Sequence, residues 1–145
     1  MRGYRLGGSW LGQALLGLAL LTPRLPAQVT LEAAAERARG LWLAHDVSGL
    51  VSGSDTIRLQ IPGVGFSSAL GPAQAARLLD RYLETAREIA FEVRGVRLAG
   101  PDHGYAEGWR KYVVQGTSEE REETVYLGFR QLGGKWRVRE VRIVP

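Results

Sequence analysis

The chain has 145 residues, of which 19 are basic and 15 acidic, giving a formal net charge of +4. It has no cysteine, which excludes disulfides and thiol chemistry and leaves the hydrophobic core as the source of stability. Three of the basic residues lie within residues 1–27, so the rest is nearly neutral, with 16 basic against 15 acidic side chains. This balance gives no support to nucleic-acid binding.

Residues 1–27 have the pattern of a cleaved secretory signal peptide. Two arginines near the start precede an apolar run over residues 11–21, which is too short to span a bilayer, and Ala27 offers a cleavage site. A retained membrane anchor is the alternative interpretation. We expect export to the periplasm or the exterior, no membrane attachment after cleavage, and one domain over residues 28–145.

The first part of this domain is predicted to contain a helix, a turn region and a strand. Residues 30–44 carry apolar side chains at spacings of three and four, which is the period of one helix face: Leu31, Ala34, Ala35, Ala38, Leu41 and Trp42. A Ser/Gly-rich turn region follows over residues 46–53. Residues 56–61 then alternate apolar and polar side chains, as a short strand does, before Pro62-Gly63 ends it and a loop begins.

The second part is predicted to be a helix followed by a series of strands. Proline is favoured at the first helical position, so Gly71-Pro72 begins a helix over residues 72–85. The strands are predicted over residues 89–98 with a bulge at Gly95, 104–117, from Thr124 after a charged loop over 118–123, and 135–144. Gly133-Gly134 marks the turn of the last hairpin. This order indicates an α+β domain with helices on one side of a curved antiparallel sheet.

Several local patterns resemble the nuclear transport factor 2-like superfamily, also described as cystatin-like or ketosteroid-isomerase-like. They are Ser48-Gly49-Leu50-Val51 after the first helix, the strand over 55–62 with its Pro-Gly exit, Gly71-Pro72-Ala73-Gln74-Ala75, and the closing Gly133-Gly134-Lys135-Trp136-Arg137-Val138. The resemblance spans nearly all of residues 31–143. It implies a sheet that wraps around the helices to form a cone with an apolar pocket. Members include isomerases, dehydratases and non-enzymes, so the resemblance implies a fold and not an activity.

Three residues are candidates for catalysis in such a cone. Asp46, next to His45, and Asp55, at the start of a strand, are candidate general bases, and Tyr82 is a candidate hydrogen-bond donor. A base at Asp55 would need burial to raise its pKa. The alternative interpretation makes Asp46 part of a solvated helix end and Asp55 part of a turn.

Five aromatic residues are predicted to line the pocket of the cone: Trp42, Tyr82, Phe91, Tyr112 and Phe129. Filling of the core is the alternative, because helix and strand periodicity already explains several of them. A metal site is not expected, since Pro101-Asp102-His103-Gly104 fits a turn better than a ligand set, and no cofactor is expected.

Arginines recur on the predicted strands, and we expect them to share the solvent face of the sheet: Arg94, Arg97, Arg110, Arg130, Arg137, Arg139 and Arg142. Arg130, Arg137 and Arg139 are the predicted partner-binding residues on this basic face. The alternative is a solvated face balanced by acidic residues, including the glutamates of the loop over 118–123.

These observations favour an exported domain that binds a small apolar ligand or a protein partner without catalysis, with a homodimer through the sheet as one form. An isomerase- or dehydratase-type enzyme that uses a pocket carboxylate as general base is the alternative. A small inhibitor-like partner protein is a third possibility.

Overall fold

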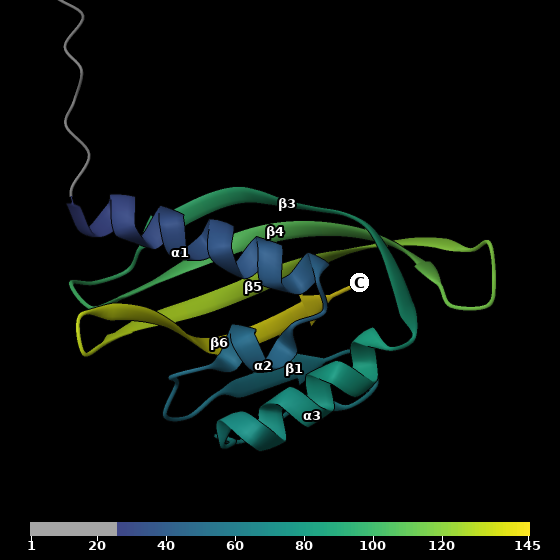
Figure 1. Ribbon diagram of the computed structural model, residues 1–145, viewed down its shortest axis with the longest axis horizontal. Helices are drawn as coiled ribbons and strands as arrows, with labels where there is room; N and C mark the ends of the chain where they lie inside the picture. The colour runs from purple at the N-terminus through teal and green to yellow at the C-terminus, as the bar shows by residue number, and fades with distance from the viewer. Residues whose placement is uncertain (1–25) are drawn as a thin grey trace, which may run out of the picture.

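The computed structural model describes residues 26–145, and these form one six-stranded sheet with helices against it (Figure 1). The helices are α1 Pro26–Leu43, α2 Val47–Val51 and α3 Pro72–Leu83. The strands are β1 Arg58–Ile61, β2 Gly65–Phe66, β3 Ala86–Leu98, β4 His103–Val114, β5 Glu120–Leu132 and β6 Lys135–Val144. The predicted signal peptide lies outside the described residues, apart from Pro26 and Ala27, which begin α1.

The strand order is β2-β1-β6-β5-β4-β3, with β3 to β6 forming an antiparallel meander and β1 running parallel to β6. The sheet curves, and α1 runs along it while α3 lies beyond β1 (Figure 1). This arrangement confirms the predicted α+β cone. No helix in the described part of the chain has the length and apolar character needed to cross a membrane.

The link between α1 and α2 is a tight turn at the start of the predicted turn region. The amides of His45 and Asp46 donate to the carbonyls of Trp42 and Leu41, both at 2.9 Å, which closes α1 in a Schellman motif. His45 occupies the left-handed position with φ of 52°, where glycine is usual. Asp46 Oδ1 then accepts from the amide of Gly49 at 2.9 Å and caps α2.

Two predicted segments take a different structure, in both cases because contacts outweigh local preference. The five residues of α2 form a helix despite Ser48 and Gly49, since helical geometry buries Val47, Leu50 and Val51. The predicted loop over 118–123 is largely strand, because β5 begins at Glu120 and pairs with β4 from Glu120 to Arg130. The predicted bulge at Gly95 is confirmed by a shift of register between Val93 and Gly95.

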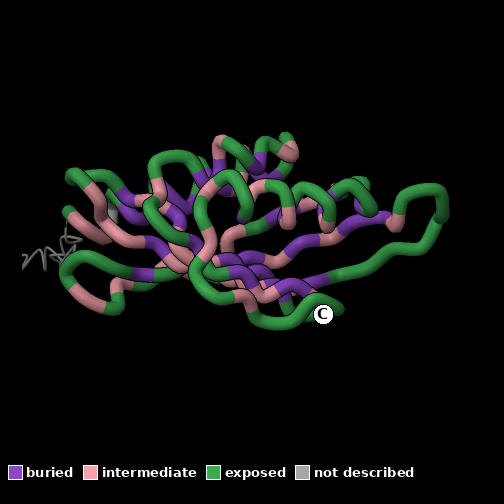
Figure 2. Tube along the Cα trace, turned by 90° about the horizontal axis from the view of Figure 1, so that it is seen from below, coloured by how far each residue is buried: buried purple, intermediate pink, exposed green. Residues whose placement is uncertain are grey.

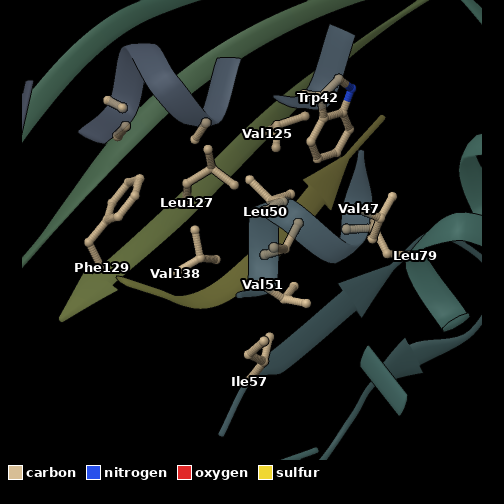
Figure 3. Packing of buried hydrophobic residues seen from close by; sticks show 14 of the residues in the cluster. Trp42, Val47, Leu50, Val51, Ile57, Leu79, Val125, Leu127, Phe129 and Val138 are labelled. Carbon is tan, nitrogen blue, oxygen red and sulfur yellow. The ribbon is translucent and has the colours of Figure 1, made fainter. Parts of the chain in front are cut away.

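The hydrophobic core lies between the helices and the concave face of the sheet, called here the inner face (Figure 3). On β5 the inner face carries Val125, Leu127 and Phe129, none more than 3% exposed, while Tyr126 and Arg130 alternate with them on the opposite, outer face. Figure 2 shows the buried residues gathered in this layer, with the tips of the hairpins exposed. The outer face has no covering layer among the described elements, so any partner would meet it directly.

Candidate functional site

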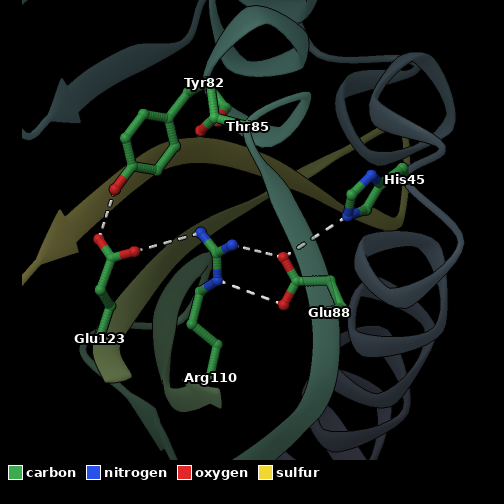
Figure 4. Close-up of polar contacts among 6 residues, drawn as sticks. All are labelled: His45, Tyr82, Thr85, Glu88, Arg110 and Glu123. Carbon is green, nitrogen blue, oxygen red and sulfur yellow. Dashed lines mark hydrogen bonds and ion pairs between the residues drawn. The ribbon is translucent and has the colours of Figure 1, made fainter. Parts of the chain in front are cut away.

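A chain of charged and hydroxyl side chains crosses the inner face, and Arg110 of β4 is at its centre (Figure 4). The Arg110 side chain is fully buried, and it lies between Glu88 of β3 and Glu123 of β5. Arg110 donates through Nη2 and Nε to the two carboxylate oxygens of Glu88, the second contact at 3.3 Å. Its Nη1 lies 3.4 Å from Oε1 of Glu123. One guanidinium therefore bridges two buried carboxylates.

Strand geometry explains why these three side chains meet. Arg110 and Glu123 are direct register partners on β4 and β5. Glu88 and Phe91 are three residues apart and would face opposite sides of a regular strand. The register of β3 shifts between Glu88 and Ala90, and this bulge places Glu88 and Phe91 on the same inner face.

Two residues outside the sheet extend the chain of contacts at either end. The Tyr82 hydroxyl, from α3, donates to Oε2 of Glu123 at 2.6 Å. At the other end, Nε2 of His45 lies 3.5 Å from Oε1 of Glu88. The contacts therefore run from the end of α1 through three strands to α3, and we call His45, Glu88, Arg110, Glu123 and Tyr82 the inner network. It ties the ends of two helices to the sheet.

Aromatic rings surround the Arg110 guanidinium. Its central carbon lies 4.1 Å from the ring centroid of Tyr112, 5.4 Å from that of Trp42 and 5.9 Å from that of Tyr82. Phe91 packs on Trp42 with a centroid separation of 5.3 Å. The charge of Arg110 is thus enclosed by π-faces and two carboxylates, and this part of the cone is filled by protein side chains.

Burial changes the protonation equilibria of Glu88 and Tyr82 in the inner network and of Tyr112 beside it. It raises the pKa of Glu88, although the positive charge of Arg110 and its hydrogen bonds act in the opposite direction. Burial also raises the pKa of Tyr82, and the hydrogen bond to the Glu123 carboxylate adds to this effect. The pKa of Tyr112 is raised by burial first and by Glu123 second. Both phenols therefore remain hydrogen-bond donors at neutral pH.

Four of the five predicted pocket residues gather around Arg110: Trp42, Tyr82, Phe91 and Tyr112. The fifth, Phe129, lies elsewhere on the inner face and contributes to the lining of two surface hollows. Their role in lining a ligand pocket stays a prediction.

The predictions that Arg110 lies on the solvent face and that Glu123 lies in a charged loop are both wrong, because each side chain is buried against the other. One signal was available for Arg110: it shares its alternation with Ala106, Gly108 and Tyr112, which all face inward.

The two candidate general bases lie outside the inner network. Asp46 is exposed, and its carboxylate caps α2. Asp55 is fully exposed, and its pKa is lowered, first by the hydrogen bond from the amide of Thr56. Neither carboxylate lies in the interior of the cone, where a general base of this type would have to be. Of the three candidates for catalysis, only Tyr82 belongs to the network.

The three predicted partner-binding arginines are divided between two places. Arg137 donates through Nη1 to the carbonyl of Ser52 at 3.3 Å, at the end of α2. Arg130 and Arg139 instead line a hollow of about 500 Å³ on the outer face, together with Arg58 of β1. We call this the outer hollow.

A second, shallower hollow of about 410 Å³ reaches the inner network from outside, where His45 and Glu88 contribute to its lining. Within residues 26–145, no group of three or more histidine or acidic side chains is arranged to hold a metal ion.

Comparison with solved structures identifies the fold. A ketosteroid isomerase-like protein from Erwinia carotovora atroseptica superimposes with a TM-score of 0.67 at 17% identity, covering 83% of this chain and 96% of the other. The chain has the nuclear transport factor 2-like fold. A protein of unknown function with this fold from Shewanella oneidensis gives a TM-score of 0.59 at 10% identity, covering 82% of this chain and 98% of the other. No protein-family model and no curated protein matches the sequence.

Proposed function

We propose that this nuclear transport factor 2-like domain is exported and that it acts by binding a protein partner through the outer face of its sheet, without catalysis. The observation that carries the proposal is the contrast between the two faces. On the inner face, Arg110 and its carboxylates are buried and paired with one another. On the outer face, arginines from neighbouring strands line an open hollow.

A small apolar ligand in the cone is less well supported by the same geometry. Arg110 and the rings of Trp42, Tyr82 and Tyr112 occupy the space around the inner network. An apolar molecule that entered there would have to separate a buried guanidinium from its carboxylates, which is strongly unfavourable.

A second copy of the chain is one partner that the outer face could take, because a homodimer through the sheet would cover it. Light scattering coupled to size-exclusion chromatography measures this directly. A dimer that becomes a monomer in Arg139→Glu supports the outer face as its interface, and a dimer that this variant leaves intact contradicts it.

For another protein as partner, the test is chemical crosslinking in the exporting cells, followed by mass spectrometry of the captured complex. Arg139→Glu should abolish a crosslink to one defined partner while the far-ultraviolet circular dichroism stays unchanged. Arg81→Glu is the matched control, since Arg81 is an exposed residue of α3 and not of the sheet. Equal crosslinking in both variants would contradict the proposal.

Export is tested by the mass of the protein recovered from outside the cytoplasm. Cleavage after Ala27 predicts a chain that begins at Gln28. Recovery of the full-length chain in the membrane fraction would favour the retained anchor instead.

One observation favours an enzyme of the isomerase or dehydratase type as the second candidate. Glu88 has a raised pKa and borders the hollow shared with His45, so it could exchange a proton with a bound substrate. Glu88→Gln would then abolish turnover while Asp55→Asn leaves it intact. Turnover that survives Glu88→Gln would remove this candidate.

A further inference from the structure

The outer hollow is shaped by a glycine and a bulge at the same place in the sheet. Gly128 lies between its register partners Tyr105 on β4 and Glu140 on β6 and forms part of the floor. A Cβ at Gly128 would stand 3.1 Å from Cβ of Glu140, closer than ordinary packing permits. The missing side chain therefore leaves space on the outer face between Tyr105 and Glu140.

The bulge directs an arginine toward this space. Gly128 pairs with Glu140 and Phe129 pairs with Val138, so Arg139 is an additional residue on β6 without a partner on β5. Bulges turn side chains away from the regular alternation and are frequent beside binding sites. Arg139 lines the hollow as a result, next to Arg58 of β1 and Arg130 of β5.

The positive charges of the hollow are incompletely paired. Among the described residues, neither Arg58 nor Arg139 has an ion pair within 4.0 Å, and Nε of Arg130 lies 3.9 Å from Asp102. Asp102 is already engaged by His103, whose Nδ1 is 3.0 Å from its Oδ1. Three guanidinium groups thus face two lining carboxylates, Asp102 and Glu140.

A third carboxylate, that of Asp55, lies near these arginines, but it does not neutralise them. It does not line the hollow, and it is fully exposed, so solvent screens its charge. Arg139 and Arg130 lower its pKa less than the amide of Thr56 does. The guanidinium groups of Arg58 and Arg139 therefore keep donors free for a ligand, and a planar guanidinium fits the two oxygens of an oxyanion.

We propose that the outer hollow binds the oxyanion of a small ligand, a carboxylate or a phosphate, between Arg58, Arg130 and Arg139. The ring of Tyr105, which is 40% exposed and lines the hollow, supplies an apolar surface for the rest of the ligand. Glu140 on the same lining repels dense negative charge and so favours a single oxyanion over a polyanion. This inference rests on the proposed binding role of the outer face and gives that face a ligand class.

Isothermal titration calorimetry of the purified protein with benzoate, which has one carboxylate, and separately with inorganic phosphate, tests the inference. Sodium chloride holds the ionic strength constant, so that general screening does not imitate binding. We expect saturable binding of at least one of the two, and the one that binds identifies the oxyanion as carboxylate or phosphate. Arg58→Gln and Arg139→Gln should each weaken it by about tenfold.

Arg94→Gln is the matched control, because Arg94 lies on β3 outside the hollow and faces Trp109 at 4.8 Å. It should bind as the wild-type protein does, and circular dichroism should show all three variants folded. Absence of saturable binding to both probes, or equal binding by wild type and Arg139→Gln, overturns the inference. If crosslinking to a protein partner still depends on Arg139 in that case, the binding role of the outer face stands and only the oxyanion fails.

Discussion

Arg110 and Glu123 face each other across β4 and β5 as direct register partners, with 3.4 Å between Nη1 and Oε1 and both side chains at most 3% exposed. A buried ion pair of this kind adds little net stability when intact, but it becomes strongly unfavourable when one partner is removed. The inner network is therefore best tested by substitutions that leave a buried charged side chain without its partner.

Arg110→Ala should be the most destabilising of these substitutions. It leaves Glu88 and Glu123 without their cation and opens a cavity beside Trp42, so we expect the free energy of unfolding to fall by about 3–5 kcal/mol. Urea denaturation followed by circular dichroism measures it. Arg94→Ala, exposed on the outer face, should change stability by less than about 1 kcal/mol. Equal effects of the two would contradict the central place of Arg110.

Tyr82→Phe tests the contact between α3 and the sheet. The substitution removes the hydroxyl that donates to Glu123 at 2.6 Å and leaves a buried carboxylate oxygen without that donor. We expect a loss of about 1–3 kcal/mol in the free energy of unfolding. Tyr105→Phe on the outer face is the matched control and should be nearly neutral. A neutral Tyr82→Phe would show that the hydroxyl does not hold α3 in place.

The stability of the protein should respond to pH through Glu88. Burial raises its pKa in the folded state, so the folded protein holds this proton more tightly than the unfolded chain, whose glutamate pKa is about 4.3. The stability that this proton contributes is present below the pKa of the unfolded chain and is lost as pH rises through the pKa of the folded state.

Wild type should therefore lose free energy of unfolding relative to Glu88→Gln as pH rises above about 4. Urea denaturation of both proteins over a series of pH values gives the difference. If this difference in the free energy of unfolding stays constant, or if wild type becomes more stable than Glu88→Gln as pH rises, burial is not the main influence on the pKa of Glu88.

His45 offers a test of backbone strain that is independent of its side chain. Its φ of 52° suits glycine, whereas a residue with a Cβ is less stable in the left-handed region. His45→Gly and His45→Ala both remove the imidazole beside Glu88, so their difference isolates the backbone. We expect the glycine variant to be more stable by roughly 0.5–1 kcal/mol in thermal or urea unfolding. An alanine variant of equal or greater stability would contradict the Schellman geometry.

The last strand shows which elements the periodicity of a single sequence can predict. Residues 135–144 alternate, follow a Gly-Gly turn and form β6 with the same bounds. The helix beginning at Pro72 follows in the same way from its proline and apolar stripe, although it ends at Leu83 and not at residue 85. Local preference and burial agree in these elements, so one sequence suffices to predict them.

The inner network could not be predicted by the same means. A charged residue on a strand is expected outside, since burying an unpaired charge is highly unfavourable. Arg110 is an exception only because register brings Glu123 opposite it and a bulge turns Glu88 inward. Register and bulges depend on how strands pair, which the periodicity of a single strand does not contain. For the same reason, the sequence does not predict that Arg137 contacts Ser52 while Arg139 lines the outer hollow.

Native mass spectrometry of the exported protein, compared between wild type and Arg139→Glu, tests the central claim most directly. The account predicts that any bound partner or ligand seen on wild type is lost from Arg139→Glu while the protein keeps its folded charge-state distribution. A bound small molecule that Arg139→Glu retains, but that is released on denaturation, would contradict the account, because it would place the binding site inside the cone.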